Sequence, residues 1–427
     1  MLLRALQHKN YRLFFCGQAV SLIGTWISRI ALSWLVYRMT GSAPVLGVVN
    51  FANQIPTFFL VPFTGVLVDH WNRHRMLIAT HALLMIHAFI LAFLALTGII
   101  QVWQIILLSL IQGIIHSFEI PARQSFVSEM VEKKEVLANA IALNSTLFNV
   151  TRLVGPAIAG ILIAALGEGI CFFLDGITFL AVIASLLAMT IKPHTVSTKG
   201  MDVLKGLKEG FDYAFGFPPV RAILLLVALV SMMGLSYLTL MPVIARDILG
   251  GDAGVYGFMT SSAGAGALAG ALYLASRKTV RGLAKHIAVS VVITGAGLIA
   301  LSFSRDLWLS IVTIFVTAFG IMLQMAASNT VIQTLVDDDK RGRVLSFYIV
   351  ALMGVSPFGS LLAGWLANLI GTMATLFMAG LICVAGGVFF TLKLPMIRQL
   401  IRPVYVKKGI VPEVAKGIQE AEKASEL

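Results

Sequence analysis

The chain has 427 residues, of which 58% are hydrophobic and only 12% are charged. This composition excludes a water-soluble globular protein with an ordinary polar surface. Twelve apolar runs are each long enough to cross a bilayer core of about 30 Å, which takes roughly 20 helical residues. They lie at about 11–36, 46–69, 76–98, 103–119, 139–166, 169–191, 221–245, 255–275, 286–303, 308–328, 344–370 and 373–394. We therefore predict an all-α membrane protein with twelve transmembrane helices.

The formal net charge of +12 is spread along the chain rather than gathered in one patch. If the amino end is cytoplasmic, most of the 32 Lys and Arg residues fall in the terminal segments and the inner loops, whereas the outer loops hold only Arg38, Arg246 and Arg305. This is the positive-inside pattern. We expect both termini to be cytoplasmic, and no nucleic-acid partner, because no compact basic patch remains.

The first predicted helix has a polar stripe that is formed by Gln18, Thr25, Arg29 and Ser33. These residues share one side at 100° per residue. An arginine that faces lipid costs about 2.5–3.5 kcal/mol on insertion scales, so the stripe must face protein or water. Arg29 could equally be a structural arginine bonded to backbone carbonyls or part of a cavity. Trp34, Tyr37 and Arg38 are typical of the outer membrane interface.

The turn after the second run reads Gly-Val-Leu-Val-Asp-His-Trp-Asn-Arg-His-Arg from Gly65 to Arg75. It places Asp69 four and six residues before Arg73 and Arg75, and Asn72 suits a turn that needs positive φ. The segment resembles the motif that joins helices two and three in the major facilitator superfamily of secondary transporters.

This resemblance implies the major facilitator fold, with twelve helices in two six-helix bundles. It also implies that Gly65, Asp69, Arg73 and Arg75 form a conformational latch on the inner face. The latch would act near the start of helix eleven, around Arg343 and Ser346.

The fourth predicted helix has a second polar stripe, made of Ser109, Gln112, His116 and Glu119. Two striped helices predict a shared aqueous cavity. Drug exporters of the superfamily often carry Arg-x-x-Gln-Gly here, but Ser109 replaces the arginine. The proton route assigned to that arginine therefore does not transfer to this chain.

The fifth predicted helix contains Arg152, Gly155, Pro156 and Gly160. Proline removes a backbone hydrogen bond and glycine allows close helix contact. The segment resembles the helix-five motif of superfamily exporters, although an ordinary kinked packing helix has the same composition. Together with Trp34–Ser42, it is most similar to the branch that contains enterobactin exporters and macrolide efflux pumps.

Asp175 in the sixth helix and Arg29 in the first lie at similar depths below the outer surface, about 9 to 10 Å at 1.5 Å per residue. We expect them to form an ion pair, and we expect Asp175 or Glu119 to exchange a driving proton. In the second half, Thr317 and Gln324 lie on one stripe of helix ten, and methionines supply an adaptable apolar wall.

Four segments are predicted from the change from apolar to mixed, charged sequence after Lys192 and from weak internal repetition. They are an N-terminal six-helix bundle (1–191), a cytoplasmic linker with an amphipathic helix (192–220), a C-terminal six-helix bundle (221–394) and a cytoplasmic tail (395–427). The linker helix follows from the helical spacing of Leu204, Phe211 and Phe215.

The resemblance implies a proton-coupled exporter of an amphipathic small molecule, of drug or siderophore type, that works by alternating access. An importer or a lysophospholipid flippase on the same fold is the alternative. A polytopic membrane enzyme is disfavoured, because the chain lacks the usual catalytic and nucleotide-binding motifs. We expect no cofactor, because the proton gradient supplies the energy, and no metal site, because the three cysteines are far apart. The expected partners of the monomer are the lipid bilayer and the small-molecule substrate.

Overall fold

The computed structural model describes residues 4–131, 134–190, 211–277, 279–337 and 340–410. Within helices it does not describe the side chains of residues 62, 65–67, 69, 70, 134 and 135. The described residues contain twelve helical crossings long and apolar enough to span a membrane, and no strand. The prediction of an all-α protein with twelve transmembrane helices is therefore confirmed.

The first six crossings are α1 (Lys9–Thr40), α2 (Ala43–His70), α3 (Arg73–Leu96), α4 (Val102–Phe126), α5 (Lys134–Leu166) and α6 (Glu168–Leu187). The seventh crossing is made of α8 (Pro218–Leu229), the π-helical turn η3 (Val230–Gly234), α9 (Tyr237–Val243) and the π-helical turn η4 (Ile244–Ile248). The remaining crossings are α10 (Ala253–Ala275), α11 (Leu283–Phe303), α12 (Leu307–Leu335), α13 (Arg341–Ile349) with η5 (Val350–Gly354) and α14 (Ser356–Ile370), and α15 (Thr372–Lys407).

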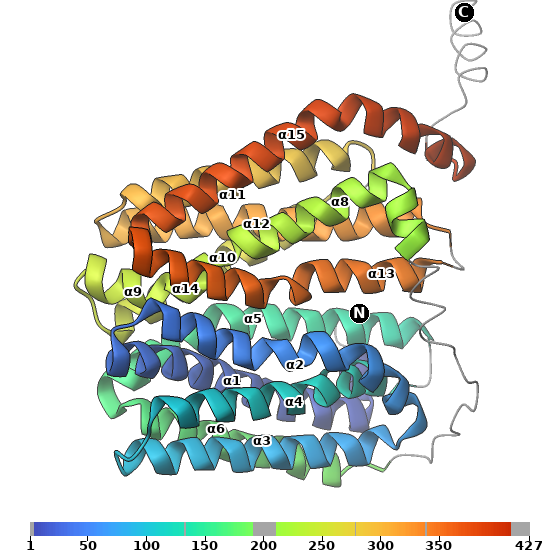
Figure 1. The fold of residues 1–427 in the computed structure, drawn as a ribbon. Coiled ribbons are helices and arrows are strands. Elements are labelled where there is room, and N and C mark those ends of the chain that lie inside the picture. Colours follow the sequence, from blue (N-terminus) through green and yellow to red (C-terminus); the bar gives the residue numbers. More distant parts are fainter. Residues whose placement is uncertain (1–3, 132–133, 191–210, 278, 338–339, 411–427) are drawn as a thin grey trace, which may run out of the picture.

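The helices form two groups that lie side by side, with α1–α6 in one and α8–α15 in the other (Figure 1). Contacts between the groups are made mainly by α5 with α10 and by α2 with α14. The described chain begins and ends at the same end of this bundle, which we call the terminal end (right in Figure 1). The other end, which carries the loop between α1 and α2, is the opposite end.

Three helices run at least seven residues further than the hydrophobic pattern predicts, among them α12, which ends at Leu335. α4 continues through Pro121 to Phe126, and α15 passes through Pro395 and Pro403 to Lys407. Part of the segment predicted as a tail from residue 395 is therefore helical. The predicted linker helix lies mostly in residues 192–210, outside the described part of the chain, and the boundaries of the four predicted segments stay a prediction.

The turn between α2 and α3 differs from the expectation for Asn72. Its φ is −71°, and its side-chain oxygen accepts a hydrogen bond from the Arg75 backbone N–H at 3.0 Å. Asn72 is thus the N-cap of α3 in an extended conformation rather than a turn residue with positive φ. A capping side chain satisfies a free N–H of the first helical turn, which explains why asparagine suits this position.

The outer surface of the bundle is apolar, as a lipid environment requires. Phe303, Trp308 and Leu392 are each at least 70% exposed. Exposing this many large apolar side chains to water would be unfavourable. In a bilayer they contact lipid chains of similar polarity. The fold is therefore that of a membrane-embedded protein.

The two groups approach each other closely at several glycines. A methyl group built on Gly160 of α5 would lie 2.7 Å from the carbonyl oxygen of Ala253, at the start of α10. One built on Gly257 would lie 2.5 Å from the carbonyl oxygen of Pro156. A methyl group built on Gly364 of α14 would lie 2.5 Å from the carbonyl oxygen of Ala43 in α2. These contacts bring backbones together where any larger residue would separate them.

Replacing Gly160 by alanine should therefore destabilise the contact between the groups. Overpacking of this kind costs about 1–3 kcal/mol, and we expect a lower thermal-unfolding midpoint for the protein in detergent. Gly216→Ala is the matched control, because a methyl group there meets nothing within 4 Å. Equal midpoints for the two variants would contradict the close contact at Gly160.

Candidate functional site

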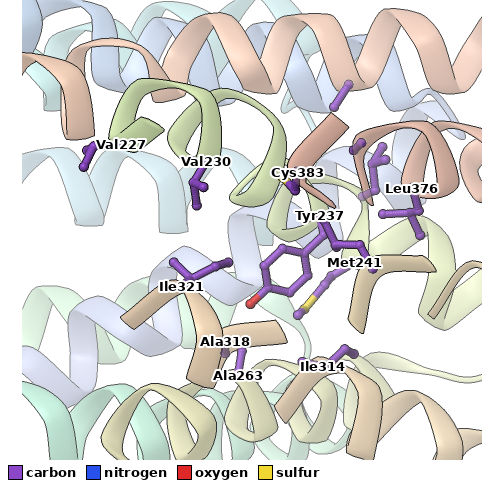
Figure 2. Close-up of a cluster of buried hydrophobic side chains, with 14 of the residues drawn as sticks. Val227, Val230, Tyr237, Met241, Ala263, Ile314, Ala318, Ile321, Leu376 and Cys383 are labelled. Atoms are coloured by element: carbon purple, nitrogen blue, oxygen red, sulfur yellow. The ribbon is translucent and has the colours of Figure 1, made fainter. Parts of the chain in front are cut away.

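A cavity of about 370 Å³ lies between the two groups of helices. Its walls come from α1, α2 and α5 on one side, and from α9, α10, α12, η5 and α14 on the other. Figure 2 shows Tyr237 and Met241 of α9 converging with Ile321 and Ala318 of α12 and with Ala263 of α10. All five of these residues line the cavity.

The lining is amphipathic. Its apolar part includes four methionines, Met241, Met322, Met325 and Met353. Its hydroxyl and amide side chains, apart from two tyrosines, are Ser33, Asn50, Gln54, Thr239, Thr260, Ser356 and Ser360. Such a wall can accept apolar bodies of varied shape and still offer hydrogen bonds.

The only charged side chains among the described residues that line the cavity are Arg29 and Arg152. Arg29 of α1 is exposed, and its guanidinium carbon lies 5.4 Å from the centre of the Trp26 ring. Arg152 of α5 is half-buried. The sequence predicted Arg29 as a cavity residue, but it placed Arg152 only in the helix-five motif.

Apart from Arg29, the residues predicted for cavity and coupling do not line this cavity. Most bond within their own helix or to a neighbour in the same group, as is the case for Thr25 with the Ser21 carbonyl (3.0 Å), Gln112 with Asn53 (2.8 Å), Thr317 with the Thr313 carbonyl (2.8 Å) and Gln324 with Ser328 (3.5 Å). α4 contributes no described residue to the lining, so the expectation that its stripe faces the same cavity as the α1 stripe is wrong.

The expected ion pair between Arg29 and Asp175 is also wrong, because the structure has none between these described residues. Asp175 is 3% exposed and lies against α1 at Gly24, where a built methyl group would be 2.9 Å from its Oδ1 atom. Arg29 follows Gly24 by five residues, about 140° around the helix at 3.6 residues per turn. Equal depth therefore does not place the two side chains on the same face. Among the described residues, Oδ1 of Asp175 has no hydrogen-bond partner.

The α4 stripe instead belongs to a buried polar cluster inside the first group. Glu119 accepts a hydrogen bond from Arg123 at 2.7 Å, and its other oxygen lies 3.7 Å from Nδ1 of His116. Nearby, Gln18 of α1 lies 3.4 Å from the ring nitrogen of His81 of α3. Glu119 and His81 are 6% and 3% exposed. The cluster thus joins α1, α3 and α4 away from the cavity.

At the terminal end, Arg73 donates a hydrogen bond to Glu129 at 2.8 Å, and both side chains are nearly buried. Glu129 lies just after α4, and the sequence did not single it out. Gly65 and Asp69 lie in α2, but the Asp69 side chain is outside the described part of the structure. The backbone N–H of Arg75 donates a hydrogen bond to the side-chain oxygen of Asn72.

The opposite end is closed by contacts between the two groups. The Tyr37 hydroxyl donates a hydrogen bond to Asp247 of η4, and Arg246 donates one to the Tyr37 carbonyl at 3.4 Å. One turn deeper, Trp34 stacks on Tyr256 with ring centres 6.1 Å apart. We call these residues the opposite-end closure. The sequence suggested only an interfacial role for Trp34 and Tyr37, because the pairing of α1 with α9 and α10 is not a local property.

The helix-five motif lies between α1 and α10. A methyl group on Gly155 would be 2.6 Å from Cβ of Trp26, whereas Gly160 and the Pro156 carbonyl face α10. The motif therefore packs α5 against both groups and places Arg152 in the cavity. Among the described residues, no three side chains are grouped to hold a metal ion.

The buried pair Glu119–Arg123 should contribute to stability in a measurable way. Glu119→Gln leaves a guanidinium with 15% exposure without its counter-charge, which we expect to cost about 3–5 kcal/mol. The double variant with Arg123→Gln should cost less than the sum of the single variants in a double-mutant cycle on unfolding in detergent.

The control cycle uses Arg38 and Glu168, which bond at 2.7 Å at the opposite end with the arginine 55% exposed. Solvent screening limits such a pair to about 0–1 kcal/mol. Similar coupling energies in the two cycles would show that the Glu119–Arg123 pair is no better shielded from solvent than the exposed pair.

A family model described as "Transmembrane secretion effector" matches residues 2–407. The Staphyloferrin A transporter of Staphylococcus aureus is 27% identical over 88% of this chain and 95% of its own length. Macrolide efflux protein A of Streptococcus pyogenes is 25% identical, with 89% and 96% covered. The multidrug efflux pump Tap of Mycolicibacterium fortuitum is 26% identical, with 88% and 93% covered.

Solved structures of transporters share the fold. A bacterial homolog of the human lysosomal transporter Spinster superposes with a TM-score of 0.69 at 14% identity, covering 95% of this chain and 99% of that one. A mutant of the peptide transporter POT gives a TM-score of 0.72 at 11% identity, with 92% and 95% covered. At these identities the likeness concerns the fold alone.

Proposed function

Because the chain belongs to the transmembrane secretion effector family of the major facilitator superfamily, we propose that it exports an amphipathic small molecule of the drug or siderophore type. Membership of this family makes it a transporter rather than an enzyme. The proposal is supported by its relatives, which are named for staphyloferrin A transport, macrolide efflux and multidrug efflux. It would act as a monomer in the bacterial inner membrane.

The observation that carries the proposal is the asymmetry of the cavity between its two ends. At the opposite end the two groups touch through the closure residues and the Gly160 contact. Towards the terminal end, none of the α5 residues 141–150 is buried in the described structure. The next residue towards the opposite end, Thr151, is buried, with 2% of its surface exposed. This supports alternating access, with the present conformation open towards the terminal end. The positive-inside charge pattern supports a cytoplasmic location for that end.

The proton gradient is the proposed driving force, with Glu119 and Asp175 as the groups that exchange the proton. Both carboxyl groups are buried, at 6% and 3% exposure, in the first group of helices. Both lie outside the lining of the cavity, so coupling would act through helix packing rather than by direct contact with substrate.

A latch at the terminal end is the remaining part of the proposal. Gly65, Asp69, Arg73 and Arg75 would hold the inner face closed in the other conformation. The bond between Arg73 and Glu129 supports a role for this turn in joining α3 to the segment after α4. Breaking and remaking such charge-assisted bonds is a common way to separate two conformations.

The direction and coupling can be tested in everted membrane vesicles, using a compound to which a deletion strain is hypersensitive. We expect energised vesicles to accumulate the compound and to lose it when nigericin dissipates the pH gradient. Glu119→Gln or Asp175→Asn should remove this dependence. Full pH-gradient dependence in both variants would eliminate both proton carriers, and uptake only in right-side-out vesicles would indicate an importer or a flippase.

The opposite-end closure predicts a shift between conformations in Tyr37→Phe. Loss of the hydrogen bond to Asp247, worth about 1 kcal/mol, should increase the population open at that end about fivefold. The readout is labelling of a cysteine in the cavity, Ser356→Cys, by an impermeant maleimide added to right-side-out vesicles. Cys16, the exposed native cysteine, is replaced by serine in this background.

Arg305→Gln is the matched control, because Arg305 also lies at the opposite end but, among the described residues, donates only to the carbonyls of Ser302 and Ser304 next to it in the chain. It should leave the labelling rate unchanged. If Tyr37→Phe labels no faster than Arg305→Gln, the closure does not hold the two groups together.

A further inference from the structure

We propose that the cavity is built for an organic anion, an amphipathic molecule that carries one or more carboxylates. This inference rests on the proposed function, in that it takes the cavity to be the substrate site, and it names the chemical class of the substrate. The observation behind it is the charge of the lining, which contains two arginines and, among the described residues, no aspartate, glutamate, lysine or histidine.

The two arginines lie on the same wall of the cavity, where α1 contacts α5. Trp26 packs against Gly155, with 2.6 Å between its Cβ atom and a methyl group built on the glycine. Arg29 follows Trp26 by three residues and Arg152 precedes Gly155 by three. Because α1 and α5 run in the same direction, the two residues lie on either side of this contact, about 9 Å apart along the helices. Their like charges interact unfavourably. The fold therefore places both positive charges on the wall of the cavity that α1 and α5 form.

Neither guanidinium forms an ion pair with a carboxylate in the described structure. Two buried acids of the first group do not face these guanidinium groups. Glu119 pairs with Arg123, and Asp175 lies against Gly24 on a different face of α1 from Arg29. A positive charge in the membrane interior is costly unless it is paired or wetted. The missing counter-charge would be supplied by the substrate.

The chemistry of the arginines narrows the class of substrate. A guanidinium presents planar, paired donors that match the two oxygens of a carboxylate. The seven hydroxyl and amide side chains of the lining can satisfy further polar groups, and the methionines can contact an apolar body. A cationic compound would find no counter-charge and would be repelled by both arginines. The cavity thus selects against cations as well as for anions.

The charge of the substrate also matters for the energetics of export. Moving one elementary charge across the membrane is worth about 2.3 kcal/mol per 100 mV. In a cell with a negative interior, an exported anion moves in the direction that the potential favours. The membrane potential would then assist export of this class of molecule.

The test compares two xanthene dyes of similar size and opposite charge, fluorescein (anionic) and rhodamine 123 (cationic). Binding to the purified full-length protein in detergent at pH 8 is measured by fluorescence anisotropy. We expect fluorescein to bind at least tenfold more tightly than rhodamine 123. Arg29→Gln and Arg152→Gln should each weaken fluorescein binding about tenfold, whereas Arg29→Lys and Arg152→Lys should retain more of it.

Two controls separate a loss of charge from a loss of structure. Arg305→Gln removes an arginine at the opposite end and Arg398→Gln removes an exposed arginine of α15, and neither residue lines the cavity. Both should bind fluorescein within about threefold of the parent protein. The unfolding midpoint of each variant shows whether it is folded, and the comparison of the two dyes on the parent protein needs no variant.

Preference of the parent protein for rhodamine 123, or failure to bind fluorescein, would overturn the proposal. So would unchanged fluorescein binding in the glutamine variants. The assay uses no membrane and no gradient, so it is independent of direction and coupling. A protein that selects fluorescein but fails to export in vesicles would contradict the proposed function and leave the anion site intact.

Discussion

The cost of placing charge inside a membrane is the constraint on which this structure depends. Among the charged side chains deep in the described helices, Arg123 is paired with Glu119, whereas Asp175 is buried against α1 without an ion pair. Arg73, at the terminal end, is bonded to Glu129. Arg29 and Arg152 differ, because they line the cavity and have no acidic partner among the described residues. The two unpaired arginines thus lie where water or a ligand can reach them.

Close packing between the two groups of helices is the second organising feature. Glycines at Gly160, Gly257 and Gly364 let backbones touch without interlocking side chains. Contacts of this kind give large dispersion energy at short range and are lost together when helices separate. Hydrogen bonds at the opposite end, such as that between Tyr37 and Asp247, orient the two groups relative to each other. The combination is compatible with two groups that move as units around a central cavity.

Much of the fold could be predicted from the sequence, but less of the site. The twelve crossings follow from hydrophobic length, and Arg29 was assigned to a cavity because an arginine cannot face lipid. The pairing of Arg29 with Asp175 failed because depth along a helix says nothing about rotation around it. The α4 stripe was a correct sign of a protein-facing surface, but that surface faces α1 and α3 rather than the cavity.

The sequence by itself determined the number of crossings, the family motifs and the distribution of positive charge, because each is a property of one segment and its composition. Only the tertiary structure decided which side chains share a space. It placed Arg152 beside the Trp26 contact and Glu119 beside Arg123, and it joined Tyr37 to a residue 210 positions later. The physical reason is that the rotation and partners of each helix are set by packing against its neighbours, which no single segment encodes.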